Sequence, residues 1–435
     1  MKYYSTRSSQ QRGCSFSSAL LAGLAPDGGL YVPQKIPHFS SEELAAWPCN
    51  LSLSDLAIKI FPAWIGEKTL EDELTTLAPQ IFNFETPLSF LNHNTAILEL
   101  FHGPTAAFKD IGARFLAAVL ATTAAPEKRV LVATSGDTGG AVAAAFHHYP
   151  AIEVVILYPE AKVSPMQEMQ LTTWGKNVQA FCVRGDFDDC QRMVKELLLE
   201  PAYAGDFLSA NSINLGRLLP QTLYYAQASL SYQQQQGRTA GVIVPTGNLG
   251  NGVAALWAKA MGFPIGEVVL ATNSNQAIAQ YFASAGENWT PLPTITTLAN
   301  AMDVGNPSNM ERLLHLYREG GFKQLQTDVS TIVVNDQEIL LTMKKSYEQW
   351  KQLFCPHTAT ALFAREVISQ QRKHDDWIVV ATAHPAKFKE IVEKVWHSSL
   401  LSLPLPSSLQ SIIARPQAKK TIPATVSALK HYLSK

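Results

Sequence analysis

Cysteine is scarce in this sequence, with five among 435 residues, and no two of them form a CxxC pair. They stand far apart, at Cys14, Cys49, Cys182, Cys190 and Cys355. An odd number of widely spaced cysteines supports neither a disulfide framework nor a zinc site. The adjacent His147 and His148 offer no metal site, because neighbours on a helix point in different directions and no carboxylate or cysteine stands at ligand spacing. We therefore expect the cysteines to be free and without a catalytic role, and we expect no bound metal.

The sequence also lacks an excess of charge of either sign and a long hydrophobic run. The formal net charge is -1, which gives no electrostatic basis for binding nucleic acid or an anionic membrane. The opening MKYYSTRSSQQRG has no apolar core of a signal peptide, and the apolar run at 19–25 is too short to span a bilayer. We expect a cytoplasmic protein with a small-molecule substrate, no nucleic-acid partner and no membrane partner.

The length and the hydrophobic pattern predict an α/β protein with two parallel-sheet lobes behind an N-terminal accessory subdomain at 1–84. Short β-branched runs alternate with helical stretches, which is typical of βαβ units. We expect a smaller lobe at about 113–210, inserted in a larger lobe formed by 85–112 and 211–435. The expected strands are 95–101, 129–134, 153–158, 178–183, 241–245, 267–272, 331–334 and 377–382. The glutamine-rich tract 232–238 is expected to be an exposed connection, and the tail after Leu400 a loop and a closing helix.

Lys109 stands at a strand-to-helix junction. The apolar run before it stops at His102-Gly103-Pro104, and a helical pattern begins after Asp110. A lysine buried beside apolar neighbours loses part of its preference for the charged form, as an amine must before it can form a Schiff base with a carbonyl. Most lysines, however, are solvated surface groups.

The stretch VPTGNLGNG at 244–252 places three glycines between an apolar strand and an apolar helix. Glycine lets the backbone approach a ligand closely, and N–H groups at a helix start favour an anion, so the pattern indicates a phosphate site. It is neither the GxGxxG dinucleotide pattern nor a P-loop. A tight turn without a ligand is the alternative.

Two further junctions combine hydroxyl groups with strand ends. In TSGDTGG at 134–140, Ser135 and Thr138 could hold a carboxylate, while Asp137 suits a cationic or hydroxyl group or is simply a helix N-cap. In VVATAHPAKF at 379–388, Thr382 ends a strand and should face the same crevice as the other loops, because ligands bind at the carboxyl ends of parallel strands. The alternative for Thr382 is a helix cap, and His384 is expected to be structural.

Taken in order, HGPTAAFKD, ATSGDTGG, PTGNLGNG and ATAHPAKF resemble the motifs of the threonine synthase family, and so do YYSTR at 3–7 and DGGLYVP at 27–33. The resemblance implies a tryptophan-synthase-β-like fold of type II that binds pyridoxal 5'-phosphate. By this resemblance Lys109 carries the cofactor and then moves protons, Thr382 faces the pyridine nitrogen, and Asp137 lies near the ring 3-hydroxyl. The implied holders of the cofactor phosphate are Gly247, Asn248, Leu249, Gly250 and Asn251, and Ser135 and Thr138 would hold the substrate carboxylate.

The reaction that the resemblance implies is the conversion of O-phospho-L-homoserine and water to L-threonine and phosphate, the last step of threonine biosynthesis, by a monomer or homodimer. The departing phosphate needs cationic or multi-donor contacts of its own. Candidates are Arg114, Lys162, Ser164, Asn211, Ser212, Asn214 and Arg217. A phospho-lyase that releases a 2-oxo acid and ammonia, a dehydratase of unphosphorylated serine or threonine, and an inactive binding protein on the same fold stay open as alternatives.

Overall fold

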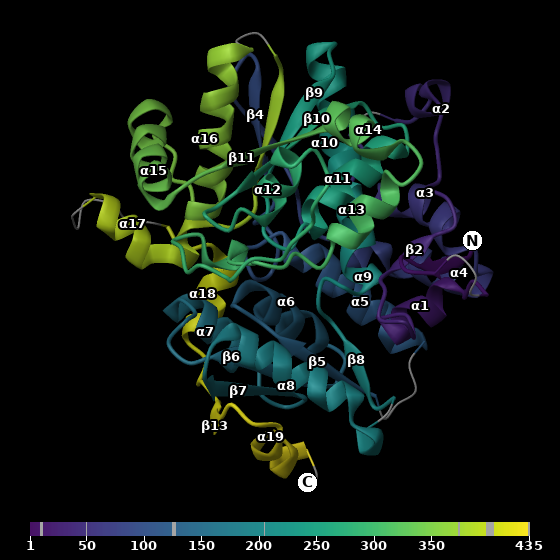
Figure 1. Cartoon of the computed structure of the whole chain (residues 1–435), viewed down its shortest axis with the longest axis vertical. Coiled ribbons are helices and arrows are strands. Elements are labelled where there is room, and N and C mark those ends of the chain that lie inside the picture. Colours follow the sequence, from purple (N-terminus) through teal and green to yellow (C-terminus); the bar gives the residue numbers. More distant parts are fainter. Residues whose placement is uncertain are drawn as a thin grey trace.

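The computed structural model describes residues 1–8, 12–48, 50–123, 128–203, 205–372, 375–396 and 404–433. It contains two large sheets, one above the other in Figure 1, with the N-terminal elements packed beside them. No helix in the described ranges is long and apolar enough to cross a membrane. Cys14, Cys182, Cys190 and Cys355 are free thiols, and Cys49 lies outside the described residues.

The larger sheet has six strands in the order β11-β10-β9-β12-β4-β3, and only β3 runs antiparallel to its neighbour. Successive residues of β9 point to opposite faces: Val242 and Val244 pack toward α10 and α11, whereas Ile243 packs toward α16. Burial on both faces explains the continuous apolar runs of these strands. The strands are β3 (Leu88–Asn92), β4 (Thr95–Glu99), β9 (Ala240–Pro245), β10 (Ile265–Thr272), β11 (Val329–Val333) and β12 (Trp377–Ala381).

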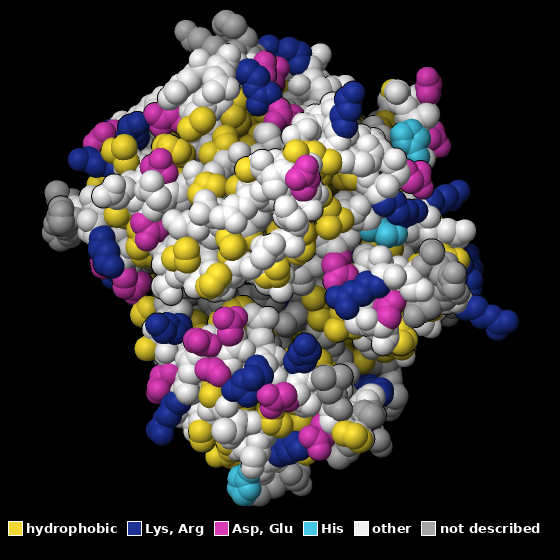
Figure 2. All heavy atoms as spheres, in the orientation of Figure 1, with side chains coloured by type: hydrophobic (Ala, Val, Ile, Leu, Met, Phe, Trp, Pro, Cys, Tyr) yellow, Lys and Arg dark blue, Asp and Glu magenta, His cyan; other side chains and the backbone are white. Residues whose placement is uncertain are grey.

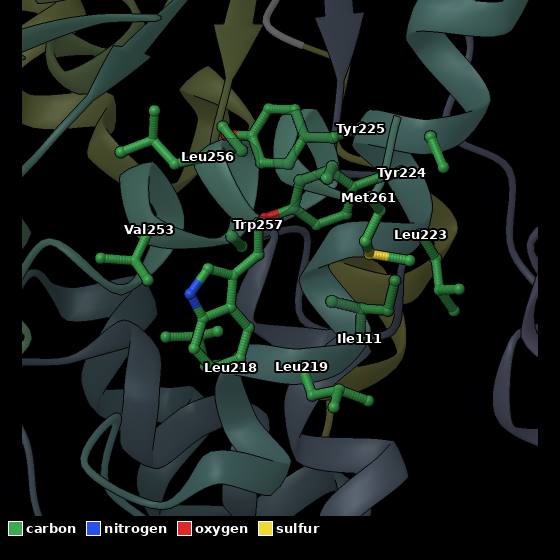
Figure 3. Packing of buried hydrophobic residues seen from close by; sticks show 14 of the residues in the cluster. Ile111, Leu218, Leu219, Leu223, Tyr224, Tyr225, Val253, Leu256, Trp257 and Met261 are labelled. Carbon is green, nitrogen blue, oxygen red and sulfur yellow. The ribbon is translucent and has the colours of Figure 1, made fainter. Parts of the chain in front are cut away.

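Helices cover both faces of the larger sheet (Figure 1). Tyr224 and Tyr225 of α10 pack with Val253, Leu256 and Trp257 of α11 in the apolar layer of Figure 3. The helices of this lobe are α10 (Thr222–Gln236), α11 (Gly250–Ala260), α12 (Ala277–Ala283), α13 (Met310–Leu316), α14 (Gly321–Asp328), α15 (Asp336–Trp350), α16 (Pro356–Gln371) and α17 (Lys389–Trp396), with 3-10 turns at Leu219–Gln221, Asn300–Met302 and Pro385–Phe388.

The smaller sheet is parallel throughout, in the order β13-β7-β6-β5-β8. Its strands are β5 (Arg129–Ala133), β6 (Glu153–Pro159), β7 (Val178–Arg184), β8 (Phe207–Ser209) and β13 (Lys420–Pro423). Its helices are α5 (Lys109–Thr123), α6 (Asp137–Phe146), α7 (Pro165–Thr172), α8 (Phe187–Leu199), α9 (Leu215–Leu218), α18 (Ser407–Ile413) and α19 (Val426–Leu433), with a 3-10 turn at Pro201–Tyr203.

The N-terminal elements share the core of the larger lobe. Trp64 of α3 stacks on Trp257 of α11 with ring centroids 5.2 Å apart, and both belong to one continuous apolar cluster. The elements are β1 (Tyr3–Ser5), α1 (Phe16–Ala22), β2 (Tyr31–Pro33), α2 (Ser41–Ala45), α3 (Leu53–Ile65) and α4 (Lys68–Ile81).

Two predictions about the fold are wrong. The glutamine-rich tract is not a connection: α10 continues to Gln236, because Tyr232 is fully buried against Phe90 and glutamine is a good helix former. The tail is more than a loop and a helix, since β13 pairs with β7 and therefore belongs to the smaller sheet, not to the larger lobe.

Candidate active site

A cavity of about 610 Å³ lies between the two lobes, where Figure 2 shows the surface hollowed. It brings together segments that are far apart in the sequence, including Lys109 and the glycine-rich turn at 246–251. The predicted residues on its wall are Lys109, Ser135, Asp137, Thr138, Asn211, Ser212, Arg217, Gly247, Asn248, Leu249, Gly250, Asn251 and Thr382. The carboxyl ends of β5, β9 and β12 thus face one crevice, as expected for an open parallel sheet.

Lys109 is the first residue of α5, and the loop before it is fixed on the end of β12. The Phe108 amide donates to the Thr382 carbonyl at 2.9 Å, and Ala107 and Ala383 form a bridge. Burial lowers the pKa of Lys109 to about 8; Asp137 opposes this effect, and the positive charges of Arg217 and Lys387 add to it. A substantial fraction of this amine is therefore neutral near physiological pH, as nucleophilic attack on a carbonyl requires.

The glycine-rich turn brings the backbone close to the opposite wall. A Cβ on Gly247 would lie 2.6 Å from the Met302 Cα, so only glycine fits there. Leu249 has a φ of 65° at the start of α11, a left-handed conformation that costs a non-glycine residue roughly 1–2 kcal/mol. Strain of this kind is typical of ligand-binding turns.

Asn251 presents an amide donor toward this turn. Its Oδ1 accepts from the Tyr224 and Tyr225 hydroxyls, which orients the side chain. Its Nδ2 is buried and has no hydrogen-bond partner among the described residues, although Asn251 lines the cavity. Buried donors are nearly always satisfied, so this one indicates a ligand acceptor.

Asp137 forms a buried ion pair that joins the two lobes. Its Oδ1 lies 2.8 Å from the Lys387 Nζ, and the two side chains are 4% and 0% exposed. The same oxygen accepts from Gln167 Nε2 at 3.0 Å, and Lys387 also donates to the Thr105 carbonyl. Burial alone would raise the pKa of Asp137, but the Lys387 and Lys109 ammonium groups hold it well below its usual range. Asp137 is therefore an ionised acceptor on the cavity wall.

His357 lies on the same wall and carries no charge. Its Nε2 accepts from the Ala301 amide at 3.1 Å, and its Nδ1 has no hydrogen-bond partner within the described ranges. Burial lowers the pKa of His357 to about 4. The adjacent Thr382 is buried and follows β12 directly.

Two of the predicted phosphate ligands lie away from the cavity. Arg114 donates to the Ile81 and Gln80 carbonyls and to Asn83 Oδ1 at the end of α4. An arginine that satisfies the last carbonyls of a helix is a structural cap. Lys162 is exposed and does not line the cavity.

Ser164 and Asn214 are also caps rather than cavity residues. Ser164 caps α7 by accepting from the Gln167 amide, and it donates to the Lys387 carbonyl at 2.8 Å. Asn214 caps α9 and donates to the Leu20 carbonyl. Sequence position alone could not separate these contacts from ligand contacts.

Three parts of the cavity wall were not among the residues predicted from the sequence. One is the irregular segment around 292–306, another is the cavity-facing side of α8 with Gln191, Arg192 and Lys195, and a third is His357. Their sequences carry no motif that predicts a site. Lys387, by contrast, stands inside the motif ATAHPAKF, so the sequence could have marked its position, although not its pairing with Asp137.

The donors on this wall fit pyridoxal phosphate. Within the described part of the chain the Lys109 amine has no hydrogen-bond or ion-pair partner, a Cβ would fill the turn at Gly247, and the Asn251 amide is unpaired. Residues 84–383 match the family model described as pyridoxal-phosphate dependent enzyme. The fold and the site thus define an enzyme that depends on this cofactor.

Two further models, threonine synthase N terminus and threonine synthase C-terminal, match residues 2–82 and 358–433. A threonine synthase of Haemophilus influenzae is 39% identical over 97% of both chains. The chain superposes on the crystal structure of threonine synthase from Escherichia coli with 36% identity and a TM-score of 0.89, covering 100% of this chain and 99% of that one. It also superposes on the structure of PLP-bound threonine synthase from Brucella melitensis with 31% identity and a TM-score of 0.88, covering 100% of this chain and 98% of that one. The chain belongs to the threonine synthase family, a family of pyridoxal-phosphate-dependent lyases of threonine biosynthesis.

Proposed function

We propose that the chain converts O-phospho-L-homoserine and water to L-threonine and phosphate. The observation that carries this proposal is a second anion-binding group beside the glycine-rich turn. Arg217 is 3% exposed and lines the cavity, and its buried Nε has no hydrogen-bond partner in the part of the chain that the structure describes. No carboxylate of the described residues forms an ion pair with it, and the charge of Asp110 offsets only part of the effect of burial on the pKa of Arg217. A buried guanidinium without a counter-ion is costly unless an anion joins it, and the leaving phosphate of such a substrate is that anion.

Asn211 and Ser212 extend this second site. Both line the cavity just before α9, and no described residue donates to the buried Asn211 Oδ1. Arg217 donates to the Ala210 carbonyl at 2.5 Å, so its guanidinium is held beside these residues. We assign the leaving phosphate to Asn211, Ser212 and Arg217, and the substrate carboxylate to Ser135 and Thr138 at the start of α6.

The cofactor, when bound, supplies the electron sink that stabilises negative charge at Cα and then at Cβ. Residues 247–251 are assigned to its phosphate, Thr382 to its pyridine nitrogen and Asp137 to the side of its 3-hydroxyl. A threonine hydroxyl cannot balance a full positive charge on the ring nitrogen as a carboxylate would. The ring should therefore take up less of the negative charge that develops at Cα and Cβ.

Lys109 is assigned the proton transfers. Its pKa of about 8 lets the free amine remove a proton from the substrate at neutral pH and return it, as a general base should. Asp137, negatively charged and close by, stabilises the ammonium form in between. The neutral His357 adds no competing charge to this wall.

The test is a product analysis of the holoenzyme with O-phospho-L-homoserine. We expect L-threonine and phosphate in equal amounts, and release of 2-oxobutanoate and ammonia without threonine would instead identify the phospho-lyase. A colourless protein that does not take up added pyridoxal phosphate would identify the inactive binding protein. A cytoplasmic location and a monomeric or homodimeric state are part of the same proposal.

A further inference from the structure

Arg312 on α13 is a fully buried guanidinium that no motif in the sequence indicates. It is 0% exposed and donates in three directions. Its Nε reaches the Tyr31 carbonyl of β2 at 3.1 Å, one terminal nitrogen reaches Asn309 Oδ1 at 2.8 Å, and the other reaches the Ile213 carbonyl at 2.7 Å. Figure 1 shows α13 beside β2 and α11. Arg312 thus connects the N-terminal elements to the cavity wall.

This charge has no counter-ion in the described part of the chain. All its acceptors are carbonyl or amide oxygens. The neighbouring Glu311 forms no ion pair with Arg312 but pairs with Arg7 at 2.5 Å, and its charge offsets only part of the effect of burial on the pKa of Arg312. Burial lowers the pKa of Arg312 to about 9, which leaves it charged at neutral pH. Retaining an uncompensated buried cation is expensive unless an anion binds nearby.

The residue between Arg312 and the cavity is Asn309. While its Oδ1 accepts from Arg312, its Nδ2 donates to the Asn248 carbonyl at 3.1 Å. Asn248 in turn accepts from Ser308 and donates to Ser212. A Cβ on Gly250 would lie 3.5 Å from Asn309 Nδ2 and 3.8 Å from Ser212 Cβ. The Arg312–Asn309 pair therefore lies directly behind the glycine-rich turn.

We propose that Arg312 is a positioning residue. Through its hydrogen bond to Asn309, its buried positive charge orients the 247–251 turn for binding the phosphate dianion of the cofactor. The guanidinium polarises the Asn309 amide, which holds the Asn248 carbonyl away from the site and leaves the backbone N–H groups of the turn free for the phosphate. The Tyr31 contact gives the N-terminal elements a function in cofactor binding. This role does not depend on which substrate the enzyme takes.

The test compares two ligands that differ only in the phosphate. The full-length apoenzyme of Arg312→Gln is titrated with pyridoxal phosphate and with pyridoxal, and binding is followed by absorbance. We expect the dissociation constant for pyridoxal phosphate to rise by about tenfold or more, equivalent to about 1.4 kcal/mol, while that for pyridoxal stays within about twofold. Arg318→Gln is the matched control, because Arg318 is a half-exposed arginine of the same region and should change neither constant.

Equal weakening of both ligands, or of neither, would overturn the proposal, because a merely structural arginine has no reason to distinguish them. Asn309→Asp covers the case in which Arg312→Gln does not fold. It keeps Arg312 but replaces the Nδ2 donor to the Asn248 carbonyl by an oxygen that cannot donate, so it should weaken pyridoxal phosphate selectively; equal weakening of both ligands, or of neither, would again contradict the proposal. Because Arg312 also donates to the Ser212 carbonyl, inhibition by inorganic phosphate is measured on the same variant holoenzymes. A loss of that inhibition with unaltered cofactor binding would place Arg312 at the leaving-group site and contradict the proposal.

Discussion

Replacing Lys387 by methionine should destabilise the protein and expose the electrostatic role of Asp137. The ammonium and the carboxylate are 2.8 Å apart, and both are buried. Removing one partner of a buried ion pair leaves an uncompensated charge and costs about 3–5 kcal/mol. Gln167 still donates to Asp137, and Lys109 stays nearby, so we expect the lower end of this range. The matched control is Lys389→Met, because its pair with Glu393 is exposed and such pairs contribute about 0–1 kcal/mol.

The size of the effect can be measured by thermal and urea unfolding. A chain of 435 residues unfolding as one unit has a transition entropy of about 0.9 kcal/mol/K, so about 3 kcal/mol lowers the midpoint by about 3 °C. The double variant Asp137→Asn/Lys387→Met should recover most of this loss, because it removes both charges, but should not recover activity.

The pH dependence gives a second measurement. In the parent protein the pKa of Asp137 is lowered by folding, so its contribution to stability is present above the unfolded pKa of about 3.9 and is lost as the pH falls toward the folded pKa. In Lys387→Met the buried carboxylate should instead have a raised pKa. The stability difference between the two proteins should therefore shrink from pH 7 to pH 5. A difference below about 1 kcal/mol that does not vary with pH would refute the reasoning.

Three further predictions concern the cavity. Lys109→Ala should abolish covalent attachment of pyridoxal phosphate, which mass and absorbance spectra will show, and should abolish activity. In the parent apoenzyme, the rate of reductive methylation of Lys109 should rise through pH about 8 rather than near the ordinary lysine pKa. Gly247→Ala should weaken cofactor binding by about tenfold or more in equilibrium titrations, since its Cβ would meet Met302 backbone at 2.6 Å; unaltered affinity would contradict this. Arg217→Met should raise the KM for O-phospho-L-homoserine by about 10–100-fold, whereas a change confined to stability would remove it from the leaving-group site.

Hydrophobic patterning located β4, β5, β6, β7, β9, β10, β11 and β12 to within a few residues, whereas β3 and the three-residue β8 were not predicted. The β-branched runs of β5, β6, β7, β9, β10 and β12 are buried on both faces, so their sequence pattern reflects a constraint that acts along the whole strand. Two elements without such a constraint were mispredicted. The four-residue edge strand β13 depends on pairing with β7, and the last turn of α10 depends on the burial of Tyr232.

The predicted site residues also divide into those that the structure places on the cavity wall and those that it places elsewhere. Lys109, the 247–251 turn, Asp137 and Thr382 follow strand ends, and the topology of a parallel sheet brings strand ends together. Arg114, Lys162, Ser164 and Asn214 are of the right chemical type, but their side chains point elsewhere or cap helices. Residue type and spacing do not specify the direction of a side chain.

The sequence by itself determined the local chemistry of this protein: which strands form, which turns need glycine and which residues stand at strand ends. The tertiary structure alone decided that Lys387 neutralises Asp137 across the two lobes, and that Arg312 stands behind the glycine-rich turn, 63 positions from Leu249. Both contacts join segments that no local pattern relates, because a buried charge finds its partner only after the chain has excluded water from around it.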